Sequence, residues 1–153
     1  MQDGFWPRIL ICAWLTLLGC SGALAQESGV GSSADELVQA GLNTLRQIED
    51  NRAGDAWEAA APFVKARFPK AELVGTLQKA RATFGSVAQR TWASVSRVRQ
   101  TTASEQGFPP GLYANIDYST RLTDGRTVFE LVSFRLELDG VWRLTGYVTR
   151  QQQ

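Results

Sequence analysis

Residues 127–148 read TVFELVSFRLELDGVWRLTGYV, and apolar side chains occupy even-numbered positions through most of this stretch. Side chains alternate between the two faces of a β-strand. The pattern therefore predicts two strands, at residues 127–138 and 141–149, each with one apolar face. Asp139-Gly140 lies between them, and these residues tolerate the positive φ of a tight hairpin turn. The stretch predicts an antiparallel β-hairpin.

The same alternation continues toward the amino terminus and predicts two more strands, at about residues 88–102 and 111–122. Asp124-Gly125 is a second hairpin turn, and the two prolines within residues 105–111 place that segment in a loop. We expect a four-stranded antiparallel sheet with one apolar and one charged face. A β-bulge would reverse the alternation locally.

Helical spacing replaces the alternation upstream of residue 85, where three helices are predicted. Ser33 and Glu36 have the spacing of a capping box, which begins the first helix. A short second helix contains Pro62, which must lie near its first turns or bend it. Pro69 occupies the first position of the third helix. The helices must cover the apolar side of the sheet. The expected fold class is α+β, with three helices packed on a curved sheet.

An export signal is predicted at residues 1–25. An apolar run at residues 9–18 is too short to span a bilayer, and Ala23-Leu24-Ala25 offers the small residues that a signal peptidase requires. Residues 26–32 are small and polar, as in a flexible tether. Residues 33–150 then form one α+β domain, exported to the periplasm or secreted.

A lipid anchor is the alternative to free secretion. Leu17-Leu18-Gly19-Cys20 resembles the lipobox of bacterial lipoproteins, in which Cys20 would carry the lipid and become the new amino terminus. Leu18 departs from the small residue preferred at that position. We expect free secretion, with membrane contact only if Cys20 is lipidated.

Composition excludes several chemistries. The chain has no histidine, and its two cysteines, Cys12 and Cys20, both lie within the predicted leader. The exported chain then lacks a His-based triad, a thiol nucleophile, a disulfide and the usual ligands of zinc or haem. We expect no metal and no cofactor. The net charge of +1 and the predicted export argue against nucleic acid as a partner.

Glu130 is the foremost candidate for a functional group, because it occupies an even-numbered position between Val128 and Val132. A carboxylate on an apolar face must be paired, protonated or open to a cavity. Arg90 is also even-numbered and could pair with it. In one interpretation Glu130 is a general base with Tyr118 or Tyr113 as a hydrogen-bond donor. In the other, the ion pair is structural and fixes the strand register.

Aromatic residues offer a second set of binding candidates. Trp57, Trp92 and Trp142 either line an apolar ligand pocket or belong to the core. Tyr147 is either a donor in a pocket or a half-buried residue with its hydroxyl in water.

Arginines recur at odd-numbered strand positions, which predicts a basic stripe on the outer face of the sheet. This stripe would contact an anionic envelope partner, form a dimer surface, or lie solvated beside acidic residues. Its members are Arg97, Arg99, Arg121, Arg135 and Arg143.

Several short motifs resemble one known family, called domain-of-unknown-function family 4019, over residues 34–149. The family consists of small exported bacterial proteins, and the resemblance implies an architecture and no particular reaction. The order of elements also resembles the cone-shaped fold of nuclear transport factor 2 and cystatin-like proteins, which implies a pocket between sheet and helices. The motifs are Gly54-Asp55-Ala56-Trp57, Gly85 with Arg90, Pro110-Gly111-Leu112-Tyr113, Tyr118-Ser119-Thr120, Glu130 and the run DGVWRLTGY at residues 139–147.

The sequence thus predicts a non-enzymatic module of the cell envelope that binds a small apolar ligand, an envelope protein or a second copy of itself. Two alternatives remain open. One is an isomerase or dehydratase that uses Glu130 as general base, and the other is a lipid-anchored envelope subunit.

Overall fold

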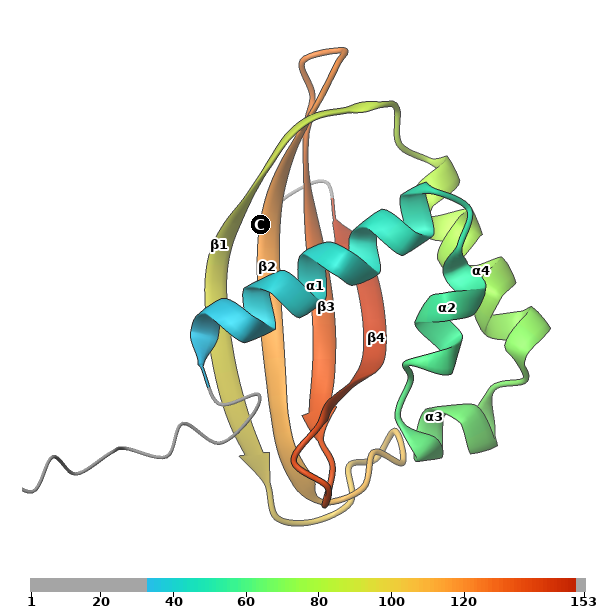
Figure 1. The fold of residues 1–153 in the computed structure, drawn as a ribbon, viewed down its shortest axis with the longest axis vertical. Helices are drawn as coiled ribbons and strands as arrows, with labels where there is room; N and C mark the ends of the chain where they lie inside the picture. Colours follow the sequence, from blue (N-terminus) through green and yellow to red (C-terminus); the bar gives the residue numbers. More distant parts are fainter. Residues whose placement is uncertain (1–32, 151–153) are drawn as a thin grey trace, which may run out of the picture.

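Residues 33–150 of the computed structural model form an α+β fold in which four helices precede a four-stranded sheet (Figure 1). The predicted leader (residues 1–25) and tether (residues 26–32) lie outside the described residues. The elements are α1 (Ala34–Glu49), α2 (Ala53–Glu58), α3 (Pro62–Arg67), α4 (Lys70–Ala82), β1 (Val87–Gln100), β2 (Gly111–Leu122), β3 (Thr127–Leu136) and β4 (Trp142–Arg150).

Helix α1 begins as the sequence predicts. The hydroxyl oxygen of Ser33 accepts a hydrogen bond from the backbone N–H of Glu36 at 3.1 Å, which satisfies one of the unpaired donors of the first turn. Asp35 and Glu36 add negative charge at this end, where the helix dipole favours it. One side of α1 is buried, with Leu37, Leu45 and Ile48 each at most 2% exposed.

The prediction of a single second helix is wrong, because Pro62 divides this segment into two short helices. Proline cannot donate a backbone hydrogen bond, so it begins α3 instead of continuing α2. The residues between the two helices pair with the sheet. Ala61 N donates to Leu144 O at 2.9 Å, and Leu144 N donates to Ala59 O at 3.2 Å. Four helices therefore replace the expected three.

The sheet is an antiparallel meander in the order β1-β2-β3-β4, as predicted. Gly125 and Gly140 have φ of 89° and 77° in the two Asp-Gly turns, where a side chain would be strained. The strands bow along their length, and α1 crosses one face of the sheet (Figure 1). Helix α1 contacts β1, β2 and β3, whereas α4 contacts β4.

The face that carries Ile116, Tyr118 and Val132, each 0% exposed, is covered by helices and is called here the helix-facing face. The opposite face carries Tyr113, Asn115 and Ser133 and is called the open face. Even-numbered residues of β2 and β3 lie on the helix-facing face, as the alternation predicts. The two edge strands follow this rule only in part.

Three register shifts interrupt the alternation in the edge strands, one of them at the start of β1 between Val87 and Gln89 and two further along. The β1–β2 register shifts between Trp92 and Ser94, so that Arg97 lies opposite Ala114 on the helix-facing face. The β3–β4 register shifts next to Ser133, so that Tyr147 lies opposite Val132. Val148 consequently lies on the open face and is 52% exposed. Leu138, which the sequence assigns to the apolar face, lies beyond β3 and is fully exposed.

Candidate functional site

Glu130 lies on β3, is 0% exposed, and has donors on both carboxylate oxygens. Arg90 of β1 places Nε and Nη2 each 2.8 Å from Oε2. The Thr120 hydroxyl donates to the same oxygen at 2.5 Å. The Tyr147 hydroxyl donates to Oε1 at 2.8 Å. The expected contact between Arg90 and Glu130 is therefore present, within a larger set of partners.

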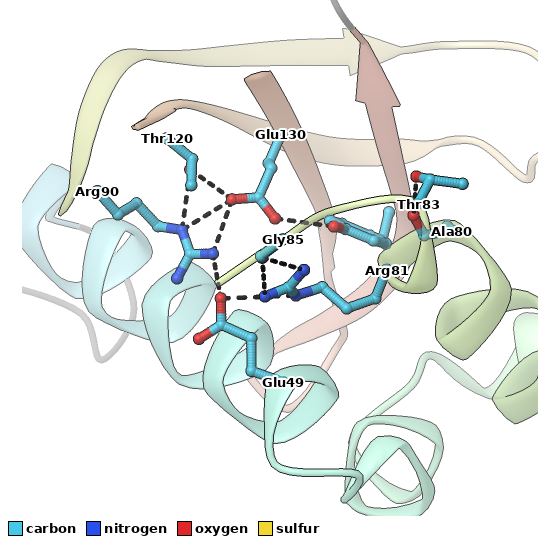
Figure 2. A network of polar contacts seen from close by, with 9 residues as sticks. Glu49, Ala80, Arg81, Thr83, Gly85, Arg90, Thr120 and Glu130 are labelled. Atoms are coloured by element: carbon cyan, nitrogen blue, oxygen red, sulfur yellow. Dashed lines mark hydrogen bonds and ion pairs between the residues drawn. The ribbon is translucent and has the colours of Figure 1, made fainter. Parts of the chain in front are cut away.

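The network continues from Arg90 to the helices (Figure 2). Arg90 Nη2 donates to Glu49 Oε1 of α1 at 2.5 Å. Arg81, near the end of α4, has its Nε 3.8 Å from the same carboxylate oxygen and donates from both terminal nitrogens to Gly85 O at 3.2 Å. Two guanidinium groups thus face two carboxylates, so the network is balanced in charge and ties α1 and α4 to the sheet.

Burial and charge act in opposite directions on Arg90. Burial lowers the pKa of its guanidinium, but hydrogen bonds and charge from Glu49 and Glu130 outweigh burial and raise the pKa overall. For Tyr147, burial and the adjacent Glu130 both raise the pKa of the phenol above its usual range. The network therefore holds Arg90 charged and Tyr147 neutral at ordinary pH.

Tyr118 lies apart from the polar atoms of this network. Its hydroxyl donates to Val38 O of α1 at 2.7 Å, and the residue is 0% exposed. Burial, the largest influence, raises the pKa of this phenol well above its ordinary value. Helix α1 fills the space around the Tyr118 hydroxyl, so this hydroxyl has no room to donate a hydrogen bond to a ligand.

The three tryptophans occupy different environments. Trp57 donates from its ring N–H to Phe68 O at 3.1 Å, and Trp142 packs against the core. Trp92 is 55% exposed although it lies opposite Tyr118 on the helix-facing face. Trp92 therefore does not belong to the core, and this corrects one of the two expectations for it, because β1 is the edge strand.

The five arginines of the predicted basic stripe do not share one face. The bulge in β1 places Arg97 and Arg99 on the helix-facing side, and this corrects the prediction. Arg121, Arg135 and Arg143 lie on the open face. Two of these make ion pairs, Arg135 with Glu137 at 2.6 Å and Arg143 with Asp139 at 2.8 Å. Acidic partners thus neutralise much of this face.

Two hollows accompany these groups. One, of about 390 Å³, lies beside the network and is lined by Ile48, Glu49, Asn51, Gln78, Arg81, Ala82 and Phe84. The other, of about 320 Å³, lies on the open face and is lined by Val98, Gln100, Phe108, Tyr113, Asn115, Ser133, Thr145, Gly146 and Val148. Neither has Glu130 in its lining.

Sequence reasoning missed three members of the network, namely Glu49, Arg81 and Thr120. Thr120 carried a usable signal, because it is even-numbered between Tyr118 and Leu122 on the buried side of β2. Glu49 follows the buried Ile48 at the end of α1, so it borders the apolar side of that helix. Arg81 gave no signal, since exposed basic residues are common in the last turn of a helix.

Within residues 33–150, no cluster of three or more His, Cys, Asp or Glu side chains is placed to hold a metal ion. In the same part of the chain, no helix is long and apolar enough to cross a bilayer.

Comparison with known proteins adds a family. A family model described as "Protein of unknown function (DUF4019)" matches residues 40–147, which is most of the chain. No curated protein and no solved structure matches the chain.

Proposed function

The chain belongs to the DUF4019 family, and we propose that it is an exported module of the cell envelope that binds a ligand or partner without catalysing a reaction. The observation that carries this proposal is the state of Glu130. This carboxylate is 0% exposed, and protein donors occupy both of its oxygens. A general base needs a lone pair directed at the proton that it removes.

The enzymatic alternative requires a rearrangement that the contacts oppose. A substrate proton could reach Glu130 only after Tyr147 or Arg90 had moved away, which would leave a buried charge without its partner. Tyr118 is also committed to α1 through its bond to Val38. The geometry therefore supports a network that holds the fold together, with binding carried out elsewhere on the molecule.

Export is proposed from the leader. The apolar run at residues 9–18 and the site at Ala23-Leu24-Ala25 support cleavage and free secretion, and Cys20 supports lipid anchoring as the alternative. A Cys20→Ala variant distinguishes the two. Unchanged mass and fractionation would support free secretion, whereas loss of a lipid-sized mass and release from the membrane fraction would support the anchor.

The fold is compatible with a binding role. We propose that it is the cone described for nuclear transport factor 2, because helices precede an antiparallel meander and α1 crosses a bowed sheet (Figure 1). A fold does not determine function. The candidate partners are a small apolar ligand, an envelope protein and a second copy of the chain, and the open face is the surface that the helices leave for them.

Native mass spectrometry of protein purified from the envelope fraction tests the proposal. We expect a retained small molecule, a bound partner or a dimer in addition to the chain mass. The rival enzyme is tested by following deuterium exchange at carbons adjacent to carbonyls in a mixture of simple ketones and enones. A chain that carries neither ligand nor partner, and whose exchange activity disappears in Glu130→Gln, would contradict the proposal.

A further inference from the structure

A row of small polar side chains crosses the open face and forms the floor of its hollow. Asn115 lies opposite Ser96 on β1 and opposite Ser133 on β3, and Ser133 lies opposite Gly146 on β4. The Ser133 hydroxyl donates to the Asn115 side-chain oxygen at 2.7 Å. Because these residues are small, the floor is low, and the larger side chains on either side stand above it as walls.

The walls are apolar and held in place. Val98 and Val148, on the two edge strands, are each 52% exposed. Phe108, in the loop that follows β1, packs edge-to-face on Tyr113 with ring centres 6.3 Å apart. The Gln100 amide donates to Phe108 O at 2.9 Å, which fixes that loop to the sheet. The walls are therefore preorganised to receive an apolar group.

Gly146 keeps the hollow open, and it also borders the bulge in β4, where glycine is common. Its φ lies outside the left-handed region. A Cβ built on it meets no atom within 4 Å, in contrast to Gly41, where a Cβ would lie 2.1 Å from the Tyr118 hydroxyl oxygen. Glycine weakens a strand interior, and it often marks a place where a ligand approaches the backbone. Position 146 fits that description.

The hollow is also uncharged. All nine of its lining residues are neutral. Charged side chains elsewhere on this face form ion pairs, Arg135 with Glu137 at 2.6 Å, Arg143 with Asp139 at 2.8 Å and Arg150 with Asp117 at 2.5 Å. A charged ligand would lose water in this hollow without gaining a counter-charge. Its volume of about 320 Å³ lies at the lower end of the range of ligand pockets, roughly 300–1,000 Å³.

We propose that the open-face hollow binds a small, uncharged, amphipathic molecule, with its apolar body between Val98 and Val148 and a hydrogen-bonding group at Asn115. The Asn115 amide nitrogen is the donor, since its oxygen already accepts from Ser133. The Thr145 hydroxyl, also in the lining, can accept. This assignment rests on the proposed function, because it names the ligand class and the site of a binding module.

The test uses two probes that share one aromatic framework. N-phenyl-1-naphthylamine is neutral, and 8-anilinonaphthalene-1-sulfonate is the same framework with one negative charge. Both increase in fluorescence in an apolar site. We expect saturable binding of one neutral probe per chain, with the sulfonate binding at least tenfold more weakly.

Gly146→Leu places a large side chain in the hollow, where the added atoms meet no close neighbour. The Tm of this variant should therefore be no lower than that of the original protein. Its affinity for the neutral probe should fall at least tenfold. Gly75→Leu is the matched control, because Gly75 on α4 also has no atom within 4 Å of a built Cβ. It should leave probe affinity unchanged.

Three results would overturn the assignment. They are an absence of saturable neutral binding, equal affinity for the two probes, and unchanged affinity in Gly146→Leu. A dimer that Gly146→Leu dissociates would instead assign the face to a second copy. If the probe experiments contradict binding in the hollow while native mass spectrometry finds a ligand or partner, only the assignment of the binding site is wrong. If native mass spectrometry finds neither and the chain has exchange activity that Glu130→Gln abolishes, the proposed function fails whatever the probes do.

Discussion

The hydroxyl of Tyr118 occupies the space that a side chain at position 41 would need. A Cβ built on Gly41 would lie 2.1 Å from this oxygen and 2.9 Å from the ring carbon that bears it. The same hydroxyl donates to Val38 O at 2.7 Å. Helix α1 therefore approaches β2 this closely only because position 41 is glycine.

Gly41→Ala should destabilise the protein by about 1–3 kcal/mol, the usual cost of adding a methyl group to a packed core. The loss would occur although alanine favours a helix over glycine by about 1 kcal/mol. Urea unfolding measures the difference. Gly75→Ala is the control, since its Cβ has open space, and it should stabilise the protein. Equal effects of the two substitutions would show that the α1–β2 contact is looser than described.

Glu130→Gln should lower the free energy of unfolding by about 3–5 kcal/mol, because it removes one partner of a buried ion pair. Thermal unfolding followed by circular dichroism measures the loss. Glu58→Gln removes an exposed pair with Lys70 and should leave Tm unchanged. A Glu130→Gln protein as stable as the original would mean that the carboxylate does not hold the strands together.

Tyr147→Phe should cost about 1–3 kcal/mol, because Glu130 Oε1 would remain buried without its hydroxyl donor. Combined with Glu130→Gln, the loss should be smaller than the sum of the single losses, since the two residues share one interaction. Ser94→Ala removes an exposed hydroxyl that donates to Asp117 and should have little effect. Strictly additive losses would contradict the direct bond between Tyr147 and Glu130.

Stability should decline above about pH 10, the ordinary pKa of tyrosine. Burial raises the pKa of Tyr113, Tyr118 and Tyr147 in the folded protein, so the unfolded chain loses these protons first. The tyrosines therefore contribute stability that is present below pH 10 and lost as the pH rises toward their folded values. Tyr118 and Tyr147, the two with large shifts, each contribute a slope of about 1.4 kcal/mol per pH unit over this range.

Urea unfolding between pH 8 and pH 11.5 measures this slope, and absorbance at 295 nm reports tyrosinate. Tyr147→Phe should have a smaller slope than the original protein. Tyrosine ionisation near pH 10 in a chain that retains its native circular dichroism would contradict the prediction.

Local chemistry made much of the fold predictable. The Asp-Gly pairs at residues 124–125 and 139–140 indicated both hairpins, and Ser33 with Glu36 indicated the start of α1. These features depend on neighbouring residues, so the sequence displays them directly. Pro62 was recognised as a difficulty for the second helix, but its effect depends on Ala59 and Ala61 pairing with the distant Leu144.

The candidate site was predictable only in its centre. Alternation placed Arg90 and Glu130 on one face, and they do meet. The alternation of side chains does not predict where a bulge occurs, because an extra residue in a strand does not change the composition in a recognisable way. The bulge in β4 turns Tyr147 toward Glu130, and the bulge in β1 moves Arg97 away from Arg135. The contact between Arg90 and Glu49 of α1 could not be predicted, because it depends on how the helix crosses the sheet.

The pairing of Ala59 and Ala61 with Leu144 affects how copies of the protein could join end to end. A strand added along β4 would first have to break these two hydrogen bonds, whereas β1 is unobstructed by them. Continuous fibril growth needs two receptive edges on every subunit. With β4 obstructed at Leu144, pairing through β1 alone would join two copies related by a two-fold axis and would not continue into a fibril.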